Sequence, residues 1–343
     1  MNDTAVIAIG RNEGERLRLC LSSALSCGCR VIYVDSKSTD DSVEMARSMG
    51  ADVVELDMSL PFSAARARNA GIEMLAPGTR FVQFVDGDCE IVAGWIEKAR
   101  NALESRSDVA VVCGRRRERF PQKSVYNRMA DIEWDTAAGE AQSCGGDAMM
   151  RCDVFREVGG FDSSVVAGEE PELCQRIRAR GWKILRIDAE MTLHDAAMLS
   201  FGQWWRRMVR GGYGAMDVAT RFGAQGLFVG HVKSTRAWAI GWPAVVVFSS
   251  LVIGLTLGLV WGAITFAILV LTLPLQMLRI AKRVRKQAGS SGDAIAYGIL
   301  TMLSKWADVS GQLSYRRDRK AGRIARMIEY KGNGGPVARA AGM

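Results

Sequence analysis

Residues 81–88 read Phe-Val-Gln-Phe-Val-Asp-Gly-Asp, an apolar run followed by two carboxylates. The run predicts a β-strand that delivers Asp86 and Asp88, separated by one flexible glycine, to the edge of a sheet. Oxygen ligands of this kind suit Mg²⁺ or Mn²⁺, and such a cation can bridge a protein carboxylate to a substrate diphosphate. The stretch therefore favours a cation site, and an Asp-Gly turn with a solvated second carboxylate is the alternative.

Strands and helices are expected to alternate around this stretch. Short β-branched runs alternate with helical spacing such as Leu17, Leu21 and Leu25, which is typical of βαβ units in a parallel sheet covered by helices. The expected strands are residues 5–9, 30–34, 52–55 and 80–85, and the expected helices are residues 13–26, 40–49, 62–75 and 93–103.

Polar residues also follow the first two expected strands, where such sheets place their ligands. Asn12 and Glu13 follow the first strand, and Asp35 follows the second. The sequence G-x-G-x-x-G is missing after the first strand, and G-x-x-x-x-G-K-S/T is missing throughout the chain. These absences argue against a dinucleotide dehydrogenase and a P-loop ATPase.

A second acidic motif lies at the start of an expected helix. Glu169 and Glu170 precede Pro171, which fits the first turn of a helix, and apolar positions follow. A carboxylate at this place can serve as a general base. The alternative is an acidic cluster that caps the helix, because helix N-termini stabilise anionic side chains.

Charge and hydropathy divide the 343-residue chain. Residues 201–343 hold 20 basic and 5 acidic side chains and therefore carry a net charge of +15. Because the whole chain carries +8, residues 1–200 carry −7. The 42 residues Ala237–Leu278 carry no charge and are long enough for two membrane crossings with a reversal near Gly258–Gly262. One long buried helix is the alternative. Because basic residues flank this block on both sides, both flanks and the N-terminal part are expected in the cytoplasm.

Taken together, the motifs resemble those of family 2 glycosyltransferases with the GT-A fold, of the kind that builds bacterial polysaccharides and the cell envelope. The resemblance runs from Val6 to about Arg210. It implies an α/β fold with a Rossmann-like mixed sheet that binds a nucleotide sugar, followed by an α-helical membrane region. It rests on residues 12–13, 34–40, 65–71, 86–88, 145–147, 159–162 and 168–170.

The resemblance implies roles for residues on the donor side. Asp35 would bind the nucleotide base or ribose, and Asn12 and Glu13 would line the same pocket. Arg68 would approach the diphosphate of the nucleotide sugar.

The resemblance also implies a cation site. Asp86 would contact the ribose or the sugar, and Asp88 would hold Mg²⁺ or Mn²⁺, whose charge offsets that of the leaving nucleoside diphosphate. His194 would complete the metal site as a neutral imidazole, with an ordinary surface or core histidine as the alternative. Gly146 and Asp147 would belong to the nucleotide-sugar site.

Two further motifs depart from the family pattern. Many relatives carry Glu-Asp where this chain has Glu169 and Glu170, so the choice of base between the two stays open. The sequence beginning at Gln203 is similar to the Gln-x-x-Arg-Trp element of membrane polysaccharide synthases, which assigns Gln203 and Arg206 to the nucleotide-sugar site. Arg207 stands where that element has Trp, which argues against a processive synthase. An interfacial helix is the alternative.

The basic run at residues 115–119 is expected to form a solvated loop or to meet an anionic acceptor, and a third membrane crossing in the second half of the chain stays open. The predicted regions are a GT-A domain (1–200), amphipathic or interfacial helices (201–236), a hairpin of two transmembrane helices (237–279), a basic cytoplasmic segment (280–330) with an interfacial or re-entrant helix (293–313), and a flexible tail (331–343).

The sequence thus predicts a metal-dependent, inverting glycosyltransferase, multi-pass in the inner membrane, with its catalytic domain in the cytoplasm. Its partners would be a nucleotide-sugar donor, with UDP favoured, a lipid-linked or glycan acceptor, and membrane lipids. Nucleic acid is not expected, because the basic residues lie beside membrane segments and no recognition motif is present. The alternatives are a polyprenyl-phosphate glycosyltransferase and a catalytically silent membrane scaffold. The donor sugar, the linkage and the oligomeric state are left open.

Overall fold

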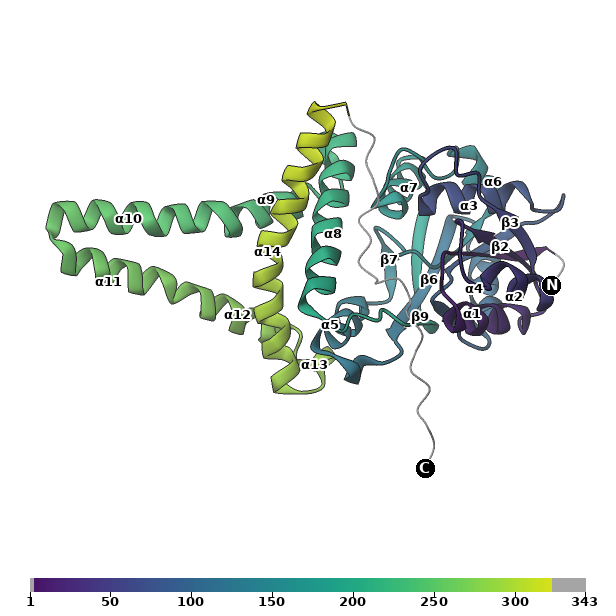
Figure 1. The fold of residues 1–343 in the computed structure, drawn as a ribbon, viewed down its shortest axis with the longest axis horizontal. Coiled ribbons are helices and arrows are strands. Elements are labelled where there is room, and N and C mark those ends of the chain that lie inside the picture. Colours follow the sequence, from purple (N-terminus) through teal and green to yellow (C-terminus); the bar gives the residue numbers. More distant parts are fainter. Residues whose placement is uncertain (1–2, 323–343) are drawn as a thin grey trace. The chain divides into compact units, whose positions relative to one another are not determined.

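The computed structural model describes residues 3–322. Within that range the chain forms two compact units, which can be followed by colour in Figure 1. The sheet unit contains residues 3–120 and 133–199, and the helical unit contains residues 121–132 and 200–322. The predicted tail over residues 331–343 lies outside the described residues.

A mixed sheet forms the centre of the sheet unit. Its strands are β1 (Thr4–Gly10), β2 (Arg30–Asp35), β3 (Asp52–Glu55), β4 (Phe81–Asp86), β5 (Cys89–Ile91), β6 (Val109–Glu118), β7 (Gly139–Ala141), β8 (Ala148–Arg151) and β9 (Lys183–His194). Their order is β3-β2-β1-β4-β8-β6-β9-β5, with β7 paired to β9. The mixed sheet of the expected fold class is confirmed.

The parallel pairing predicted from the sequence holds for only part of this sheet. β3, β2, β1 and β4 are parallel, and so are β6 and β9. β8 is antiparallel to β4 and β6, and β5 and β7 are antiparallel to β9. The expectation of a parallel sheet is therefore wrong for the second half of the sheet. Parallel neighbours need a long crossover connection, and not every connection in this half contains a crossover helix.

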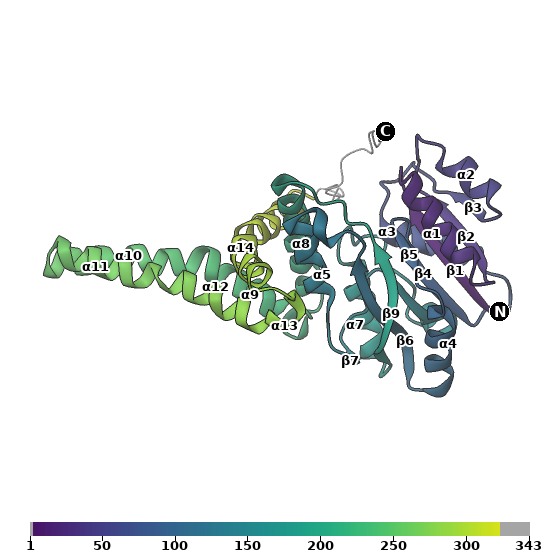
Figure 2. The same ribbon diagram turned by 90° about the horizontal axis from the view of Figure 1, so that it is seen from below.

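Helices cover both faces of the sheet (Figures 1 and 2). Trp95 donates its indole N–H to the side chain of Gln83 at 2.8 Å on one face, and Phe155 packs on Phe84 on the other, because neighbouring strand residues point to opposite faces. The helices are α1 (Glu15–Leu25), α2 (Ser42–Ser48) and α4 (Trp95–Ser105) on the first face, and α3 (Ala64–Glu73), α6 (Cys152–Glu157) and α7 (Glu169–Ala179) on the second.

The basic run at residues 115–119 does not form the solvated loop that its charge suggested. It lies in β6 and just after it, and each cation has a carboxylate partner within the sheet unit. The pairs are Arg115–Asp135, Arg116–Asp147, Arg117–Glu190 and Arg119–Glu90. The loop interpretation is wrong because residues 115–118 belong to β6, while the expectation that the run meets an anionic acceptor stays a prediction.

The helical unit consists of helices and short turns. It contains most of α5 (Val125–Trp134), and then α8 (Phe201–Arg221), α9 (Val229–Arg236), the π-helical turn η3 (Ala237–Gly241), α10 (Trp242–Leu257), α11 (Leu259–Val270), α12 (Thr272–Arg283), α13 (Arg285–Ala288) and α14 (Ser291–Lys320).

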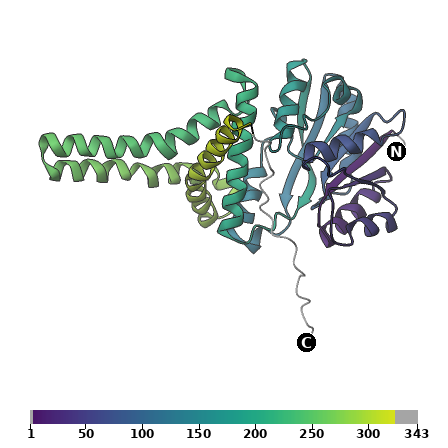
Figure 3. The same ribbon diagram turned by 45° about the horizontal axis from the view of Figure 1, so that its top comes forward.

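The helices from α9 to α12 form a long antiparallel hairpin (Figures 1 and 3). The hairpin reverses at Gly258, whose φ of 104° favours glycine, and this is where the sequence placed the reversal. Two continuous stretches, Val229–Leu257 and Leu259–Arg283, are long and apolar enough to cross a membrane, with 29 and 25 residues. Only 6% of the most apolar part of each is buried, so they do not form the core of a soluble domain.

α14 extends beyond the predicted segment 293–313 at both ends and packs along α8. The two helices approach closely at glycines, since a Cβ added to Gly212 would lie 2.1 Å from the carbonyl oxygen of Asp308 and one added to Gly311 would lie 2.0 Å from that of Val209. α14 also packs against α12 at Gly298, where an added Cβ would lie 2.3 Å from a backbone oxygen.

Candidate active site

Asp35, at the carboxyl end of β2, is buried and hydrogen-bonded. Its Oδ1 accepts from the hydroxyls of Tyr33 at 2.8 Å and Ser38 at 2.5 Å, and its Oδ2 accepts from the Ser38 N–H at 2.7 Å. The N–H of Asn12 donates to Ser38 Oγ at 2.9 Å, and Asn12 Oδ1 accepts from the Thr39 N–H at 2.7 Å. The loops after β1 and β2 are thereby tied together beside Asp35.

Arg68, on α3, is buried between two carboxylates. Its guanidinium donates to Glu169 Oε1 and to Asp86 Oδ1, each at 2.7 Å, and lies 5.4 Å from the ring centroid of Phe161. Burial disfavours the charged form of Asp86, but Arg68 and Arg116 outweigh it and lower the pKa of Asp86 to about 2. Arg68 therefore links the end of β4 to the start of α7.

A second arginine of the site, the half-buried Arg116, was not recognised from the sequence. Its guanidinium lies 2.8 Å from Asp147 Oδ2 and 3.7 Å from Asp86 Oδ2. Asp147 is fully buried and also accepts from the Thr192 hydroxyl at 2.7 Å and from the Asp86 N–H at 3.1 Å. Asp147 thus holds the end of β4 through the Asp86 N–H, and Arg116 compensates the charge of Asp147.

Asp88 and His194 lie together, with Asp88 Oδ2 and His194 Nε2 3.3 Å apart. Both are buried, and the ring of Trp134 meets the imidazole edge-on at 4.8 Å. His194 Nδ1 is buried and lies 3.8 Å from Glu118 Oε2, beyond hydrogen-bond distance. A carboxylate oxygen and an imidazole nitrogen that converge in this way, with a second carboxylate behind the ring, fit a divalent cation.

Glu170 is held by two uncharged donors. Its Oε1 accepts from the Cys144 N–H at 2.5 Å and from the Cys174 thiol at 3.0 Å. Burial raises the pKa of Glu170, and the two hydrogen bonds oppose that shift. Burial also raises the pKa of Cys174 to about 12, so its thiol keeps its proton and remains a donor. The spacing of Cys174 from Glu170, one helical turn, was a usable signal in the sequence.

Glycine is required at two places where the backbone passes close to these side chains. A Cβ added to Gly146 would lie 2.9 Å from Asp86 Oδ2 and 3.1 Å from Arg68 Nη2. One added to Gly87 would lie 3.0 Å from the carbonyl oxygen of Ile9. Gly146 therefore allows the loop before β8 to pass close to the ion pair between Asp86 and Arg68.

The remaining predicted residues form no hydrogen bond or ion pair with these groups in the described part of the chain, although the Glu13 side chain lies close to Gly10 and Gly87. Glu13 forms an ion pair with Arg16 at 2.8 Å in the sheet unit. Gln203 and Arg206 belong to the helical unit, where the Gln203 side chain caps α8 by accepting from the N–H of Ser200 at 3.0 Å. Their assignment to the nucleotide-sugar site stays a prediction.

The sheet unit therefore brings three kinds of group to the site. The carboxyl ends of β1, β2, β4 and β9 supply a tied loop pair beside Asp35 and oxygen and nitrogen ligands at Asp88 and His194. The start of α7 supplies the carboxylate of Glu170, which forms no ion pair with a cation within residues 3–322. Such a set can hold a charged leaving group and accept a proton from a hydroxyl.

Comparison with known families agrees with the resemblance expected from the sequence motifs. The sequence model of the family described as Glycosyl transferase family 2 matches residues 5–159. An uncharacterized glycosyltransferase of Mycobacterium bovis is 31% identical over 184 residues, which cover 52% of this chain and 79% of that protein.

Two longer relatives have names that state a role. The pre-mycofactocin glycosyltransferase of Mycobacterium tuberculosis is 27% identical over 270 residues, 75% of this chain and 54% of that protein. The succinoglycan biosynthesis protein ExoA of Rhizobium meliloti is 27% identical over 186 residues, 51% of this chain and 55% of that protein. The chain spans about half the length of these two relatives.

Among solved structures, the mannosyltransferase PcManGT of Pyrobaculum calidifontis, in complex with GDP-Man and Mn²⁺, is similar with a TM-score of 0.54. The identity is 15%, and the alignment covers 87% of this chain and 86% of that chain. At this identity the likeness concerns the fold alone, which is GT-A.

Proposed function

This chain belongs to glycosyl transferase family 2, and we propose that it moves one sugar from a nucleoside diphosphate sugar to a lipid-linked or glycan acceptor. The relative ExoA, a succinoglycan biosynthesis protein, supports a setting in polysaccharide or cell-envelope assembly. A UDP-sugar is the favoured donor, while the structurally similar mannosyltransferase holds GDP-Man, so both belong in a donor test.

The observation that carries the proposal is the pairing of Asp88 and His194 beside Asp86, with 3.3 Å between the Asp88 carboxylate and the imidazole. We assign Mg²⁺ or Mn²⁺ to Asp88 and His194. Such a cation, when bound, offsets the negative charge that develops on the leaving nucleoside diphosphate. The Mn²⁺ in the similar mannosyltransferase supports this assignment.

Glu170 is the proposed general base. It accepts the proton of the acceptor hydroxyl while the hydroxyl oxygen attacks the anomeric carbon, and the bond from that carbon to the diphosphate oxygen breaks on the opposite side. The configuration at the anomeric carbon is inverted, and no covalent sugar intermediate forms. Both hydrogen bonds to Glu170 end on Oε1, which leaves Oε2 for the acceptor. Glu169 is less suited, because its carboxylate is neutralised by Arg68.

The donor would lie across the strand ends. Asp35, with Asn12 and Glu13 beside it, would receive the base or ribose. Asp86 would contact the ribose or the sugar.

The diphosphate would meet the arginine side of the site. Arg68 is held 2.7 Å from Asp86 and is proposed to act near the diphosphate from that position. Gly146 and Asp147 would shape the same site, and Gln203 and Arg206 of α8 are proposed to contribute from the helical unit.

The two apolar stretches support attachment to a membrane. We propose that both cross the inner membrane and that the sheet unit lies in the cytoplasm, because basic residues flank the hairpin at both ends. A membrane position brings the enzyme to a lipid-linked acceptor.

The test is release of nucleoside diphosphate by the purified chain in detergent with Mg²⁺ or Mn²⁺, a membrane lipid extract and a panel of UDP-, GDP- and dTDP-sugars. We expect release with at least one donor and a loss of about 100-fold or more in Glu170→Gln, since general base catalysis contributes on that order. Asp88→Ala should lose both activity and the response to added metal. Glu157→Gln, an exposed carboxylate that pairs with Arg180, serves as the surface control.

Other results would redirect the assignment. Full activity in Glu170→Gln with loss in Glu169→Gln would transfer the role of base to Glu169. A product that extracts into organic solvent and forms on polyprenyl phosphate alone would identify a polyprenyl-phosphate glycosyltransferase. Absence of release and of nucleotide binding with every donor would indicate a membrane scaffold instead of an enzyme.

A further inference from the structure

One face of α14 carries an exposed apolar stripe. Its members are Ile295, Ile299, Trp306 and Leu313, which are 44%, 40%, 38% and 55% exposed. Their spacings of four, seven and seven residues place them on a single side of an α-helix. On other sides α14 packs against α8 and α12, so this stripe is the part of the helix that its neighbours leave uncovered.

Three cations continue the same face toward the end of the helix. Arg316, Arg317 and Lys320 follow Leu313 by three, four and seven residues, and all three are exposed. In the described part of the chain, none of the three forms an ion pair with a carboxylate. Like charges at this spacing repel one another, so an anion placed among them is stabilised.

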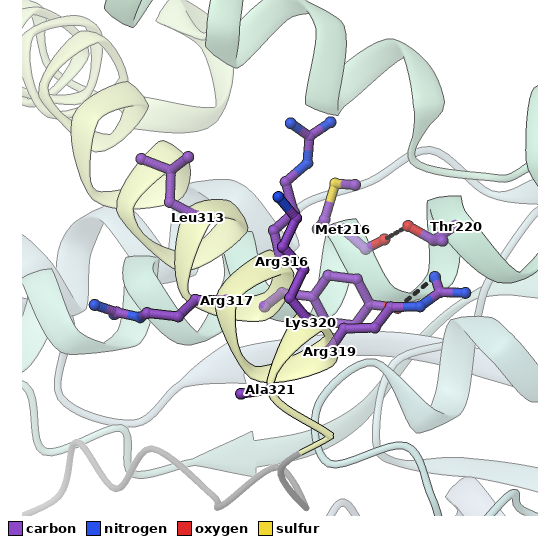
Figure 4. Close-up of a pocket in the computed structure, with 9 residues that line it drawn as sticks. Met216, Thr220, Leu313, Arg316, Arg317, Arg319, Lys320 and Ala321 are labelled. Atoms are coloured by element: carbon purple, nitrogen blue, oxygen red, sulfur yellow. Dashed lines mark hydrogen bonds between the residues drawn. The ribbon is translucent and has the colours of Figure 1, made fainter.

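These cations border a groove of about 900 Å³ between the ends of α8 and α14. Figure 4 shows Arg316 and Lys320 projecting from the last turns of α14, with Leu313 and Arg317 on one side and Met216 and Thr220 of α8 on the other. The groove thus combines positive charge with an apolar wall, and it is formed within the helical unit alone.

We propose that this groove binds the phosphate headgroup of an anionic membrane phospholipid, with the apolar stripe of α14 lying in the acyl boundary of the bilayer. The inference rests on the membrane attachment in the proposed function. A helix with an apolar face and a basic end is suited to the bilayer surface, where the cations meet phosphates and the apolar side chains meet acyl chains.

Continuity with the hairpin favours a lipid over a soluble anion. α12, which ends the second apolar stretch, contacts α14 at Gly298, next to the stripe in the helix. A soluble nucleotide or phosphate would use the cations alone and would leave Ile295, Ile299 and Trp306 exposed to water. A bilayer phospholipid accounts for both halves of the face.

The experiment places the full chain in nanodiscs of equal parts phosphatidylglycerol and phosphatidylcholine and counts the lipids retained on the released protein by native mass spectrometry. We expect retention of phosphatidylglycerol over phosphatidylcholine by about tenfold, and loss of that preference in R316Q/R317Q/K320Q, because each cation near a phosphate surface contributes substantially. The variant R316K/R317K keeps all three positive charges and should keep the preference for phosphatidylglycerol.

The matched control is R283Q/R285Q/K286Q, which removes the same charge from exposed residues elsewhere in the helical unit. The preference of this control variant for phosphatidylglycerol over phosphatidylcholine should change little. Equal loss in both triple variants would show a general charge effect and overturn the proposed groove. Thermal unfolding of each variant verifies that it is folded, and the single variant K320Q, which should lose part of the preference, carries the test if the triple variant unfolds.

Two competitors separate the sources of phosphate. Inorganic phosphate, compared with chloride at the same ionic strength, should not displace the retained phosphatidylglycerol, and displacement would show a site for a free anion. Polyprenyl phosphate should not be retained in preference to phosphatidylglycerol, and a preference for it would make the groove an acceptor site and overturn the proposal. No sugar donor is present, so this assay can fail while glycosyl transfer succeeds, and the reverse.

Discussion

Glu169 and Glu170 are neighbours in sequence and have opposite electrostatic surroundings. The Glu169 carboxylate lies 2.7 Å from the Arg68 guanidinium, which also pairs with Asp86. Among the residues that the structure describes, Glu170 accepts hydrogen bonds from a backbone N–H and a thiol, and burial raises its pKa. A raised pKa suits a base that works near neutral pH, so these different partners distinguish two residues that the sequence leaves equivalent.

The Cys174 thiol is expected to set the pH dependence of the reaction. Its hydrogen bond to Glu170 lowers the pKa of that carboxyl, so Cys174→Ala should raise the pKa. Only the ionised base is active, and activity therefore rises with pH through this pKa. The acid limb of kcat/KM should move up by about 0.5–1 pH unit in Cys174→Ala, since a thiol is a weak donor.

Cys174→Ser is the matched variant, because a hydroxyl still donates to the carboxylate. Its acid limb should stay at or below that of the unchanged protein. An acid limb in Cys174→Ala that does not move, or that moves to lower pH, would contradict the assignment of Glu170 as the titrating base.

The sequence predicted these site residues unevenly. Asp86 and Asp88 were visible because they end an apolar run, and His194 because histidine is rare in this chain. Arg116 was missed because a run of arginines is usually a solvated loop. Had residues 115–119 been recognised as a strand, Arg116 and Glu118 would have been placed on the same face. The contact of Cys144 with Glu170 had no signal in the sequence, because it depends on tertiary structure.

The crossing of α8 and α14 depends on glycine as an element of packing. Gly212 and Gly311 let the two backbones approach so closely that no side chain fits between them, with an added Cβ within 2.1 Å and 2.0 Å of a backbone oxygen. Close backbone contact of this kind sets the separation of the helices over their whole length. A larger residue would push the helices apart, because backbone atoms cannot move aside as a flexible side chain can.

Gly311→Ala is expected to lower the free energy of unfolding of the full chain by about 1–3 kcal/mol, the usual range for overpacking. The fall should appear as a decrease of several degrees in the thermal unfolding midpoint, followed by tryptophan fluorescence in detergent. Gly211→Ala is the control in α8, because no atom lies within 4 Å of its added Cβ. That variant should keep or slightly raise the midpoint, because alanine favours a helix over glycine, and an equal fall in both variants would contradict the role of close backbone packing at Gly311.

Elements with a regular hydrophobic period were predictable, and those held by long-range pairing were not. The parallel strands β1 to β4 and their helices lie within a few residues of the expected ranges. The antiparallel strand β8 pairs with β4, more than sixty residues earlier, and no local pattern encodes that choice. α14 was underestimated because Asp293, Lys305 and Asp308 interrupt its apolar residues. In the structure Asp308 is buried and lies 3.3 Å from His231.

For the whole chain, the hairpin predicts a definite orientation in the membrane. Two crossings return the chain to its starting side, so residues 3–199 and the basic end of α14 should both lie in the cytoplasm. Alkaline phosphatase inserted at Gly258 should be active, and a green fluorescent protein at the N-terminus should fluoresce. The reverse pair of results, with fluorescence at Gly258 and none at the N-terminus, would exclude this orientation.

The division of the chain has a consequence for how the protein is made. Residues 121–132 leave the ribosome between two parts of the sheet unit, yet they belong to the helical unit, where Met129 packs with Trp204 and Leu300, and Ile132 with Ala281 and Ala294. These partners are synthesised later than residues 121–132. The apolar side chains of this segment therefore stay exposed to solvent while the flanking parts of the sheet unit fold. The sheet unit is thus not a separate module along the chain, and we expect a protein cut at residue 199 to expose Met129 and Ile132 to solvent and to aggregate.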